Sequence, residues 1–321
     1  MAVSPTPGQL EYPHDNATKR SVNASLVLLQ PRRFYLYFWM RILTVLIVIL
    51  GLVGNSIVLW LLGFRIQRKP FSVYILNLAG ADALFLCSSF LIYMNELLRF
   101  ISSHVIVVVW FFLQHMFFIV SVSLVAVIST DRCLSVLFPI WYRCHRPKHT
   151  SATMCTVLWV VVILFSAVYC TLCWRKFSGP VCSNTIIMFQ FVWFIVHTCT
   201  LCVSSLTLLL RVQCSSQRRQ PPRLYLLVLL TVLVFLLCGL PIGIDNFIEF
   251  ETHSQFLPYW LRPIMACVNS SANPIIYFFL GNQRCRRREP LRVILQRALG
   301  DEEVGGGTRS TSHTKTSETS F

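Results

Sequence analysis

The sequence contains few charged residues, and acidic ones are the scarcest. Charged residues make up 13% of the 321 positions while 55% are hydrophobic, and soluble domains carry about 25% charged residues. So little charge excludes an ordinary water-soluble protein. We expect an all-α membrane fold, a bundle of seven transmembrane helices, because seven apolar stretches reach the length needed to cross a bilayer: roughly 36–62, 71–94, 105–137, 153–172, 185–210, 224–248 and 257–280.

Lysine is also scarce, and its positions exclude one class of seven-helix protein. All five lysines lie outside the apolar stretches, so an opsin or light-driven pump with an intramembrane Schiff base is excluded. A transporter would favour an internal repeat with paired broken helices, and none is apparent. An intramembrane hydrolase needs a nucleophile beside a base, but His115 and His197 have no evident acidic partner. We expect no enzyme activity and no metal or cofactor.

The basic residues cluster in alternate loops. After alternate spans lie 19 of the 28 Lys and Arg residues, whereas the opposite loops hold only four. This asymmetry places the C-terminus in the cytoplasm and, with seven spans, the N-terminus outside. The basic N-terminal segment weakens this bias without reversing it. The net charge of +15 therefore reflects membrane topology and not nucleic-acid binding. Glycosylation sequons at Asn16 and Asn23 fit an outer N-terminus.

Four segments follow from this topology. Residues 1–33 form an extracellular N-terminus and residues 34–281 the seven-helix domain. Residues 282–299 are expected to form an amphipathic helix on the anionic inner leaflet. Residues 300–321 read as a disordered cytoplasmic tail, whose Ser and Thr residues are either a solubilising end or phosphorylation sites.

Polar residues inside the spans are candidates for function. Asp82 is a carboxylate in a hydrocarbon segment, with no basic residue in a central span to pair with it. A hydrated sodium ion held by Asp82, Ser121 and Asn273 would resolve this, and a purely structural hydrogen-bonded contact is the alternative. The last span is interrupted by Asn269, Asn273, Pro274 and Tyr277, a polar break that suggests a hinge.

The third span ends in Asp131-Arg132. An acid beside an arginine at a helix end is either an interfacial ion pair of little energetic value or a switch. In the second case Asp131 holds Arg132 in one state and releases it to a partner in another. The loop 211–223 contains no acid, so Asp131 alone would supply the charge of a resting lock.

Together these motifs resemble the rhodopsin-like G-protein-coupled receptors over residues 34–298, and within them the Mas-related family. The resemblance is carried by six short motifs and three longer strings: Gly54-Asn55, Leu78–Asp82, Asp131-Arg132-Cys133, Trp159, Cys238–Pro241 and Asn273–Tyr277, and Leu61–Phe71, Cys133–Pro147 and Ser270–Phe279. It implies an extracellular ligand, a heterotrimeric G protein of Gq or Gi type, and arrestin and a receptor kinase acting on the tail. It also implies a plasma-membrane location and roles in nociception, itch or mast-cell responses. A non-signalling membrane scaffold is the alternative.

Departures from the wider class fit the narrower family. There is no cysteine between Cys87 and Cys133, so the usual disulfide from the third span cannot form. The resemblance implies a Cys173–Cys182 bridge instead, with Cys170 as a competing partner. Gly239 stands where many rhodopsin-like receptors carry tryptophan, which implies a shallow ligand site, and Pro241 keeps a kink in the sixth span.

The outer side offers two opposite ligand hypotheses. Asp245 and Glu249 share a helix face and, with Glu96, would bind a cationic amine or peptide that stacks on Trp174, Trp193 or Trp260. Alternatively these acids pair with Arg262 or Arg99. Relatives that bind basic peptides carry acids where this chain has Tyr169 and Ile186. Arg99, Arg175, Lys176 and His104 would favour an anionic ligand.

Overall fold

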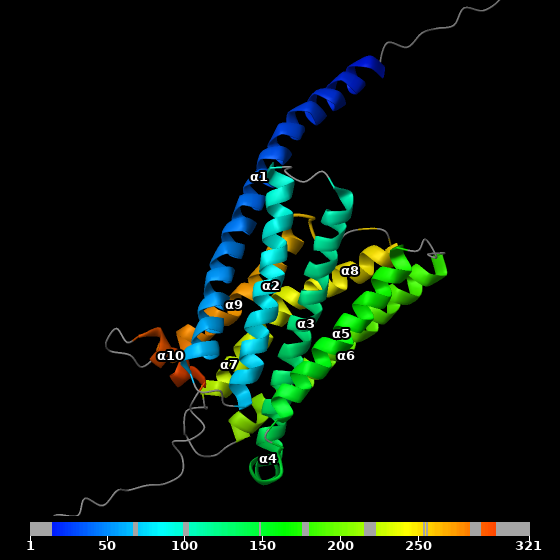
Figure 1. Cartoon of the computed structure of the whole chain (residues 1–321). Helices are drawn as coiled ribbons and strands as arrows, with labels where there is room; N and C mark the ends of the chain where they lie inside the picture. The colour runs from blue at the N-terminus through cyan, green and yellow to red at the C-terminus, as the bar shows by residue number, and fades with distance from the viewer. Residues whose placement is uncertain are drawn as a thin grey trace, which may run out of the picture.

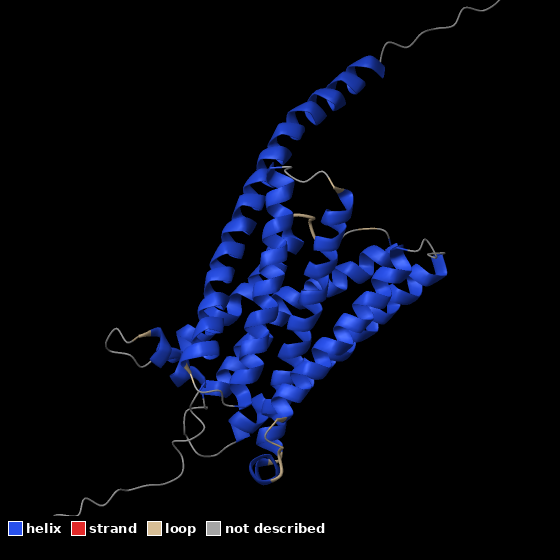
Figure 2. Cartoon of the chain, in the orientation of Figure 1, coloured by secondary structure: helices blue, strands red, loops and turns tan. Residues whose placement is uncertain are grey.

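The structure is a computed structural model that describes residues 15–66, 70–98, 103–147, 149–174, 180–214, 223–252, 254, 256–282 and 290–299. Within those ranges the chain is mostly helical, with short loops, and contains no strand (Figure 2). The helices run roughly side by side in one bundle (Figure 1). Their bounds are α1 Asp15–Trp60, η1 Leu61–Arg65, α2 Pro70–Leu98, α3 His104–Leu137, α4 Pro139–Cys144, α5 Thr150–Trp174, α6 Pro180–Cys214, α7 Arg223–Val234, η2 Phe235–Gly239, α8 Leu240–Thr252, α9 Leu261–Asn282 and α10 Leu291–Leu299.

Seven segments of this bundle are long and apolar enough to cross a membrane. The first consists of α1 from Tyr35 onward with the π-helical turn η1, and the sixth consists of α7, the π-helical turn η2 and most of α8. All seven spans predicted from the sequence are confirmed, with ends that shift by a few residues. Large apolar side chains such as Leu50 and Ile275 stay exposed on the outside of the bundle, as expected where lipid replaces water.

Helices α2 and α3 form the centre of the bundle. They pack against each other, α1 contacts α2 and α9, and α3 also contacts α5, α6 and α7. The shared core is built from apolar residues that are almost fully buried, such as Val58, Tyr74, Leu124, Leu208 and Leu280. This packing fixes the relative positions of the polar residues described below.

Gly239 and Phe235 pack against each other in an irregular turn of the sixth span. A side chain at Gly239 would lie 2.6 Å from the ring of Phe235, so the ring fills the space that a larger residue would take. Both residues belong to η2, which precedes Pro241. A π-helical turn and a nearby proline are two recognised causes of helix bending. The sixth span therefore carries a built-in irregularity at the predicted kink.

The helix after the seventh span covers Leu291–Leu299, half the length expected for it. Its residues Ile294, Leu295 and Leu299 are buried, and α10 packs against α9 and α7. The apolar face therefore contacts the bundle itself, which the sequence pattern alone did not indicate. The predicted tail, 300–321, lies outside the described residues.

Candidate functional site

A buried polar centre joins α2, α3 and α9. The Ser121 hydroxyl donates to Oδ1 of Asp82 at 2.6 Å, and the Asn273 amide donates to Oδ2 at 2.8 Å. All three residues are nearly inaccessible. The structure thus brings together the three residues proposed from the sequence for a sodium site, and their direct hydrogen bonds match the structural alternative. Among the described residues no cluster of three His, Cys, Asp or Glu side chains is able to hold a metal ion.

The polar break in the last span is stabilised by the first span. Pro274 lies inside α9 and has no N–H to bind the carbonyl of Ser270 one turn earlier. The Asn55 amide donates to that carbonyl at 3.2 Å. A side chain at Gly54 would lie 3.0 Å from the Pro274 ring. These contacts explain both residues of the first span: Gly54 leaves room for the proline ring, and Asn55 supplies the hydrogen bond that the proline cannot make.

Other residues of the predicted hinge are also buried. Asn269 is 6% exposed and Tyr277 is 1% exposed. The Tyr277 hydroxyl has no hydrogen-bond partner among the residues that the structure describes. A buried donor without an acceptor costs about 1–3 kcal/mol, so this hydroxyl would gain from a different arrangement of the helix.

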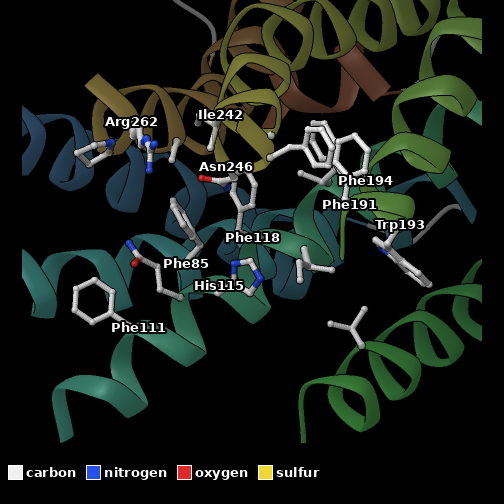
Figure 3. Close-up of a pocket in the computed structure, with 18 of the residues that line it drawn as sticks. Phe85, Phe111, His115, Phe118, Phe191, Trp193, Phe194, Ile242, Asn246 and Arg262 are labelled. Carbon is white, nitrogen blue, oxygen red and sulfur yellow. The ribbon is translucent and has the colours of Figure 1, made fainter. Parts of the chain in front are cut away.

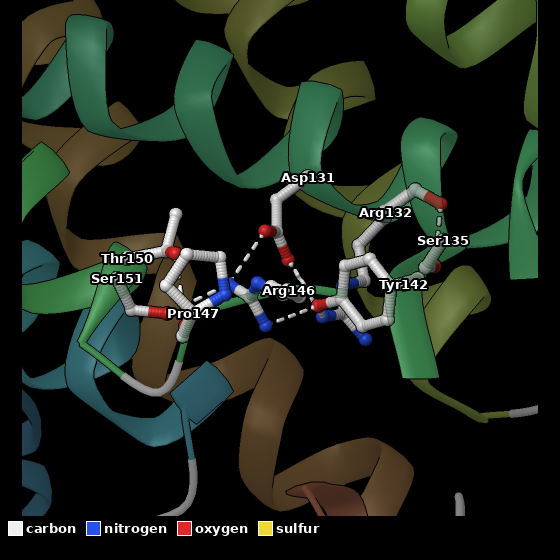
Figure 4. Close-up of polar contacts among 8 residues, drawn as sticks. All are labelled: Asp131, Arg132, Ser135, Tyr142, Arg146, Pro147, Thr150 and Ser151. Atoms are coloured by element: carbon white, nitrogen blue, oxygen red, sulfur yellow. Dashed lines mark hydrogen bonds and ion pairs between the residues drawn. The ribbon is translucent and has the colours of Figure 1, made fainter. Parts of the chain in front are cut away.

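Asp131 lies at the centre of a polar cluster (Figure 4). The cluster is at the opposite end of α3 from the cavity described below. Its carboxylate binds Arg132 at 2.7 Å and Arg146 at 2.8 Å. The Tyr142 hydroxyl donates to the same carboxylate at 2.8 Å and accepts from both arginines. Arg146 also donates to Ser151 at 2.8 Å, which connects the segment after α3 to the start of α5.

Arg132 is therefore held from several sides. Its guanidinium group is almost fully buried and lies 4.6 Å from the centre of the Phe71 ring, a cation–π contact with α2. Burial raises the pKa of the Tyr142 phenol above its usual value, so the phenol stays protonated and able to donate at physiological pH. The sequence argument identified Asp131 and Arg132 but missed Tyr142 and Arg146.

The other end of the bundle contains a cavity of about 510 Å³ lined by residues of α1, α2, α3, α5, α6, α8 and α9, and by Tyr259 before α9. Its walls are mostly apolar and rich in aromatic residues, which include Phe85, Phe118, Phe191, Trp193 and Phe194 (Figure 3). The size falls in the range of small-molecule sites. Of the tryptophans proposed as ligand contacts, Trp193 lines the cavity and Trp260 does not.

The two acidic residues of the sixth span that were predicted to bind a cationic ligand are paired within the protein. Arg262 binds both Asp245 and Glu249, the latter at 2.6 Å. Asp245 also accepts hydrogen bonds from the backbone N–H groups of Phe256 and Leu257 at 2.8 and 2.7 Å. This is the alternative in which the acids pair with Arg262.

Glu96 is paired as well, with Arg41. Of the three acids only Glu96 lines the cavity. Arg41 was not among the residues singled out from the sequence, although an arginine near the end of an apolar span is itself a signal.

Five sequence-based proposals fall on residues whose side chains lie outside the described part of the chain. These are the Cys173–Cys182 bridge with its competitor Cys170, the ligand contact Trp174, the comparison positions Tyr169 and Ile186, the glycosylation sites Asn16 and Asn23, and the residues proposed for an anionic ligand, Arg99, His104, Arg175 and Lys176. They stay predictions.

Comparison with known proteins agrees with this arrangement. Residues 54–277 match the family described as the 7 transmembrane receptor (rhodopsin family). The chain is 46% identical to Mas-related G-protein coupled receptor member X2 of Macaca mulatta, over 81% of this chain and 82% of the relative. It is 46% identical to member X1 of Homo sapiens, over 84% and 86% of the two chains, and 43% identical to member B4 of Rattus norvegicus, over 83% and 84%. These relatives are receptors and not enzymes. The chain is a multi-pass membrane protein that belongs to the Mas-related family of rhodopsin-like G-protein-coupled receptors.

Proposed function

We propose that this receptor lies in the plasma membrane with its N-terminus outside, binds a small molecule or peptide in the outer cavity, and activates a Gq- or Gi-type G protein. By likeness to its relatives, its responses are those of sensory neurons or mast cells, such as nociception and itch. The observation that carries the proposal is the buried Arg132, held by Asp131 and Tyr142. A buried, restrained arginine at the inner end of the bundle suits a group that is released to a partner.

The polar residues between the two ends act as the switch. A ligand shifts the receptor only if it binds one state better than the other. The cavity is lined by α8 and α9, so a bound ligand acts directly on the helices that carry Pro241 and Pro274. Asp82 and Asn273 connect α9 to α2, and Tyr277 follows one turn later. Movement of these elements opens the inner face and frees Arg132.

Two further partners act on the inner side. We propose that a receptor kinase phosphorylates the Ser and Thr residues of the segment 308–320 and that arrestin binds the product. The basic loops and α10 face the anionic leaflet of the bilayer.

The test measures nucleotide exchange by purified Gq and Gi heterotrimers with the full-length receptor in lipid nanodiscs. A screen of cationic, neutral and anionic compounds supplies the agonist. We expect Arg132→Ala to abolish agonist-driven exchange. Arg65→Ala is the matched control, because Arg65 lies at the end of η1 and packs over Trp60; it should keep exchange near the wild-type rate.

The competing hypothesis is a membrane scaffold without signalling. It predicts no exchange with either heterotrimer at any compound, and no difference between the two variants. That result would overturn the receptor mechanism.

A further inference from the structure

We propose that the outer cavity takes an apolar, uncharged ligand whose hydrogen-bonding group is held by His115 and Asn246. This inference rests on the proposed receptor function and names the class of ligand that its site accepts. It replaces the hypothesis that Asp245 and Glu249 bind a cation.

The charged groups near the cavity already have partners. Asp245 is fully buried and is engaged by Arg262 and by two backbone N–H groups. Glu249 is paired with the same arginine, and neither acid lines the cavity. A cationic ligand would therefore have to displace Arg262 before it reached either carboxylate, leaving a half-buried arginine without its counter-charges.

Arg41 and Glu96, which do line the cavity, neutralise each other. The Arg41 guanidinium also donates to Tyr37 and lies 5.2 Å from the Tyr93 ring centre. The Arg41–Glu96 pair and the group of Arg262 with Asp245 and Glu249, together called the outer rim, each match positive with negative charge. A ligand charge of either sign would disturb that rim without meeting an unpaired opposite charge.

His115 and Asn246, by contrast, retain unused hydrogen-bonding groups. Both side chains line the cavity and stay exposed although they lie within helices of the bundle. No hydrogen bond joins either side chain to another residue in the part of the chain that is described. Figure 3 shows the imidazole of His115 and the amide of Asn246 among the aromatic side chains that surround the cavity.

Other polar residues that line the cavity already make hydrogen bonds within the protein. Gln114 donates to the Ser89 hydroxyl at 2.7 Å, and Nδ1 of His197 is 2.7 Å from the carbonyl of Trp193. Their side chains are thus partly or fully occupied by the protein. His115 on α3 and Asn246 on α8 are polar side chains of the cavity that no described residue engages, and they belong to two helices that a ligand would bridge.

The aromatic walls of the cavity determine which chemical groups the rest of the ligand can carry. Aromatic side chains supply a large apolar contact surface, and transfer of an ion into such surroundings without a partner is costly. An imidazole and an amide can each donate and accept, so they suit a hydroxyl, a carbonyl or a neutral amide. A largely apolar body with one such group satisfies both requirements.

The test uses a panel of probe compounds in which each apolar body is made with four different end groups. Aromatic, alicyclic and straight-chain bodies of about 10 to 25 heavy atoms, a span suited to the cavity volume, each carry a hydroxyl, a methyl, a primary amine or a carboxylate. Binding is measured as the rise in the thermal unfolding midpoint of the purified full-length receptor, which depends on ligand concentration relative to Kd. We expect hydroxyl compounds to stabilise the receptor most.

Two substitutions locate the contact. His115→Phe and Asn246→Leu remove the polar groups at nearly constant volume, and each should weaken hydroxyl-probe binding by about three- to tenfold while leaving methyl-probe binding unchanged. Glu249→Gln is the control at a rim residue outside the cavity lining, and it should bind the hydroxyl probe like the wild type. Unfolding midpoints without ligand verify that the variants are folded.

Each other outcome counts against the inference. Stronger binding of amines would indicate a cation site, and stronger binding of carboxylates would indicate an anion site at Arg41 or Arg262. Equal binding of methyl and hydroxyl compounds, or no stabilisation by any probe, would also overturn it. Arg132→Ala separates this test from the proposed function, because that variant should bind the probes normally even where it no longer drives nucleotide exchange.

Discussion

Pro274 and Asn55 show how two residues far apart in the sequence share one function. The proline leaves the Ser270 carbonyl without its helical partner, and the Asn55 amide on the first span supplies a donor. The same amide also donates to Gly51 within its own helix. A buried carbonyl that lost both partners would be costly in an apolar bundle.

Asn55→Leu should therefore lower the free energy of unfolding by about 1–3 kcal/mol. Thermal unfolding of the purified receptor measures the change. Thr200→Val is the control, because the Thr200 hydroxyl only reinforces a carbonyl of its own helix and its loss should have little effect. Equal destabilisation by the two variants would contradict this account.

Tyr142 is the residue through which the loop after α3 restrains Arg132. Tyr142→Phe removes a donor to Asp131 and an acceptor for Arg132, but leaves the ring over which Arg146 lies. We expect basal nucleotide exchange to rise about two- to tenfold, the equivalent of one hydrogen bond.

Burial raises the pKa of the Tyr142 phenol, so its neutral form persists. The effect of Tyr142 on basal nucleotide exchange should therefore be constant between about pH 6 and pH 8. Exchange assays over that range, with wild type and Tyr142→Phe in parallel, test both statements. A basal rate equal to the wild type would show that Tyr142 does not restrain Arg132.

At the scale of single helices, α6 and α8 approach closely at Gly243. A Cβ atom there would lie 2.1 Å from the ring of Phe194, and that ring lines the cavity. The helices meet this closely only because the residue has no side chain.

Gly243→Ala should force the Phe194 ring to move and so weaken binding of any cavity ligand by about tenfold or more, because a shifted wall changes the fit. Gly63→Ala is a matched control, since a Cβ at Gly63 meets nothing within 4 Å. Ligand titrations on both variants test the expectation. Unchanged affinity in Gly243→Ala would show that Phe194 does not define the cavity wall.

For the whole molecule, α10 connects the end of the last span to the sixth. Leu295 is fully buried while Leu291 is 47% exposed on the same short helix. Leu295→Ala should destabilise the receptor by about 2–5 kcal/mol, and Leu291→Ala by much less. Thermal unfolding of the two variants measures the difference, and similar midpoints would indicate that α10 is not part of the folded core.

Much of this architecture could be predicted from the sequence, because a span in a bilayer must be long and apolar. Asp82, Ser121 and Asn273 could also be grouped in advance, since polar residues in such spans need partners. The pairing of Asp245 and Glu249 with Arg262 could be stated only as one of two alternatives, because periodicity places residues on a face without saying what lies opposite. Tyr142 and Arg146 were missed for a related reason: their contacts depend on how the loop after α3 folds back.

Asp245 makes the opening of the outer loop, which contains Phe256 and Leu257, measurable by hydrogen exchange. Its carboxylate protects the amide hydrogens of Phe256 and Leu257, although the Phe256 side chain is 68% exposed. These two hydrogens exchange with solvent only when the loop leaves α8, so their exchange rates count such openings. An agonist that displaces the outer end of the sixth span should speed their exchange while neighbouring helical amides stay protected, which hydrogen–deuterium exchange with mass spectrometry can follow without a label on the receptor.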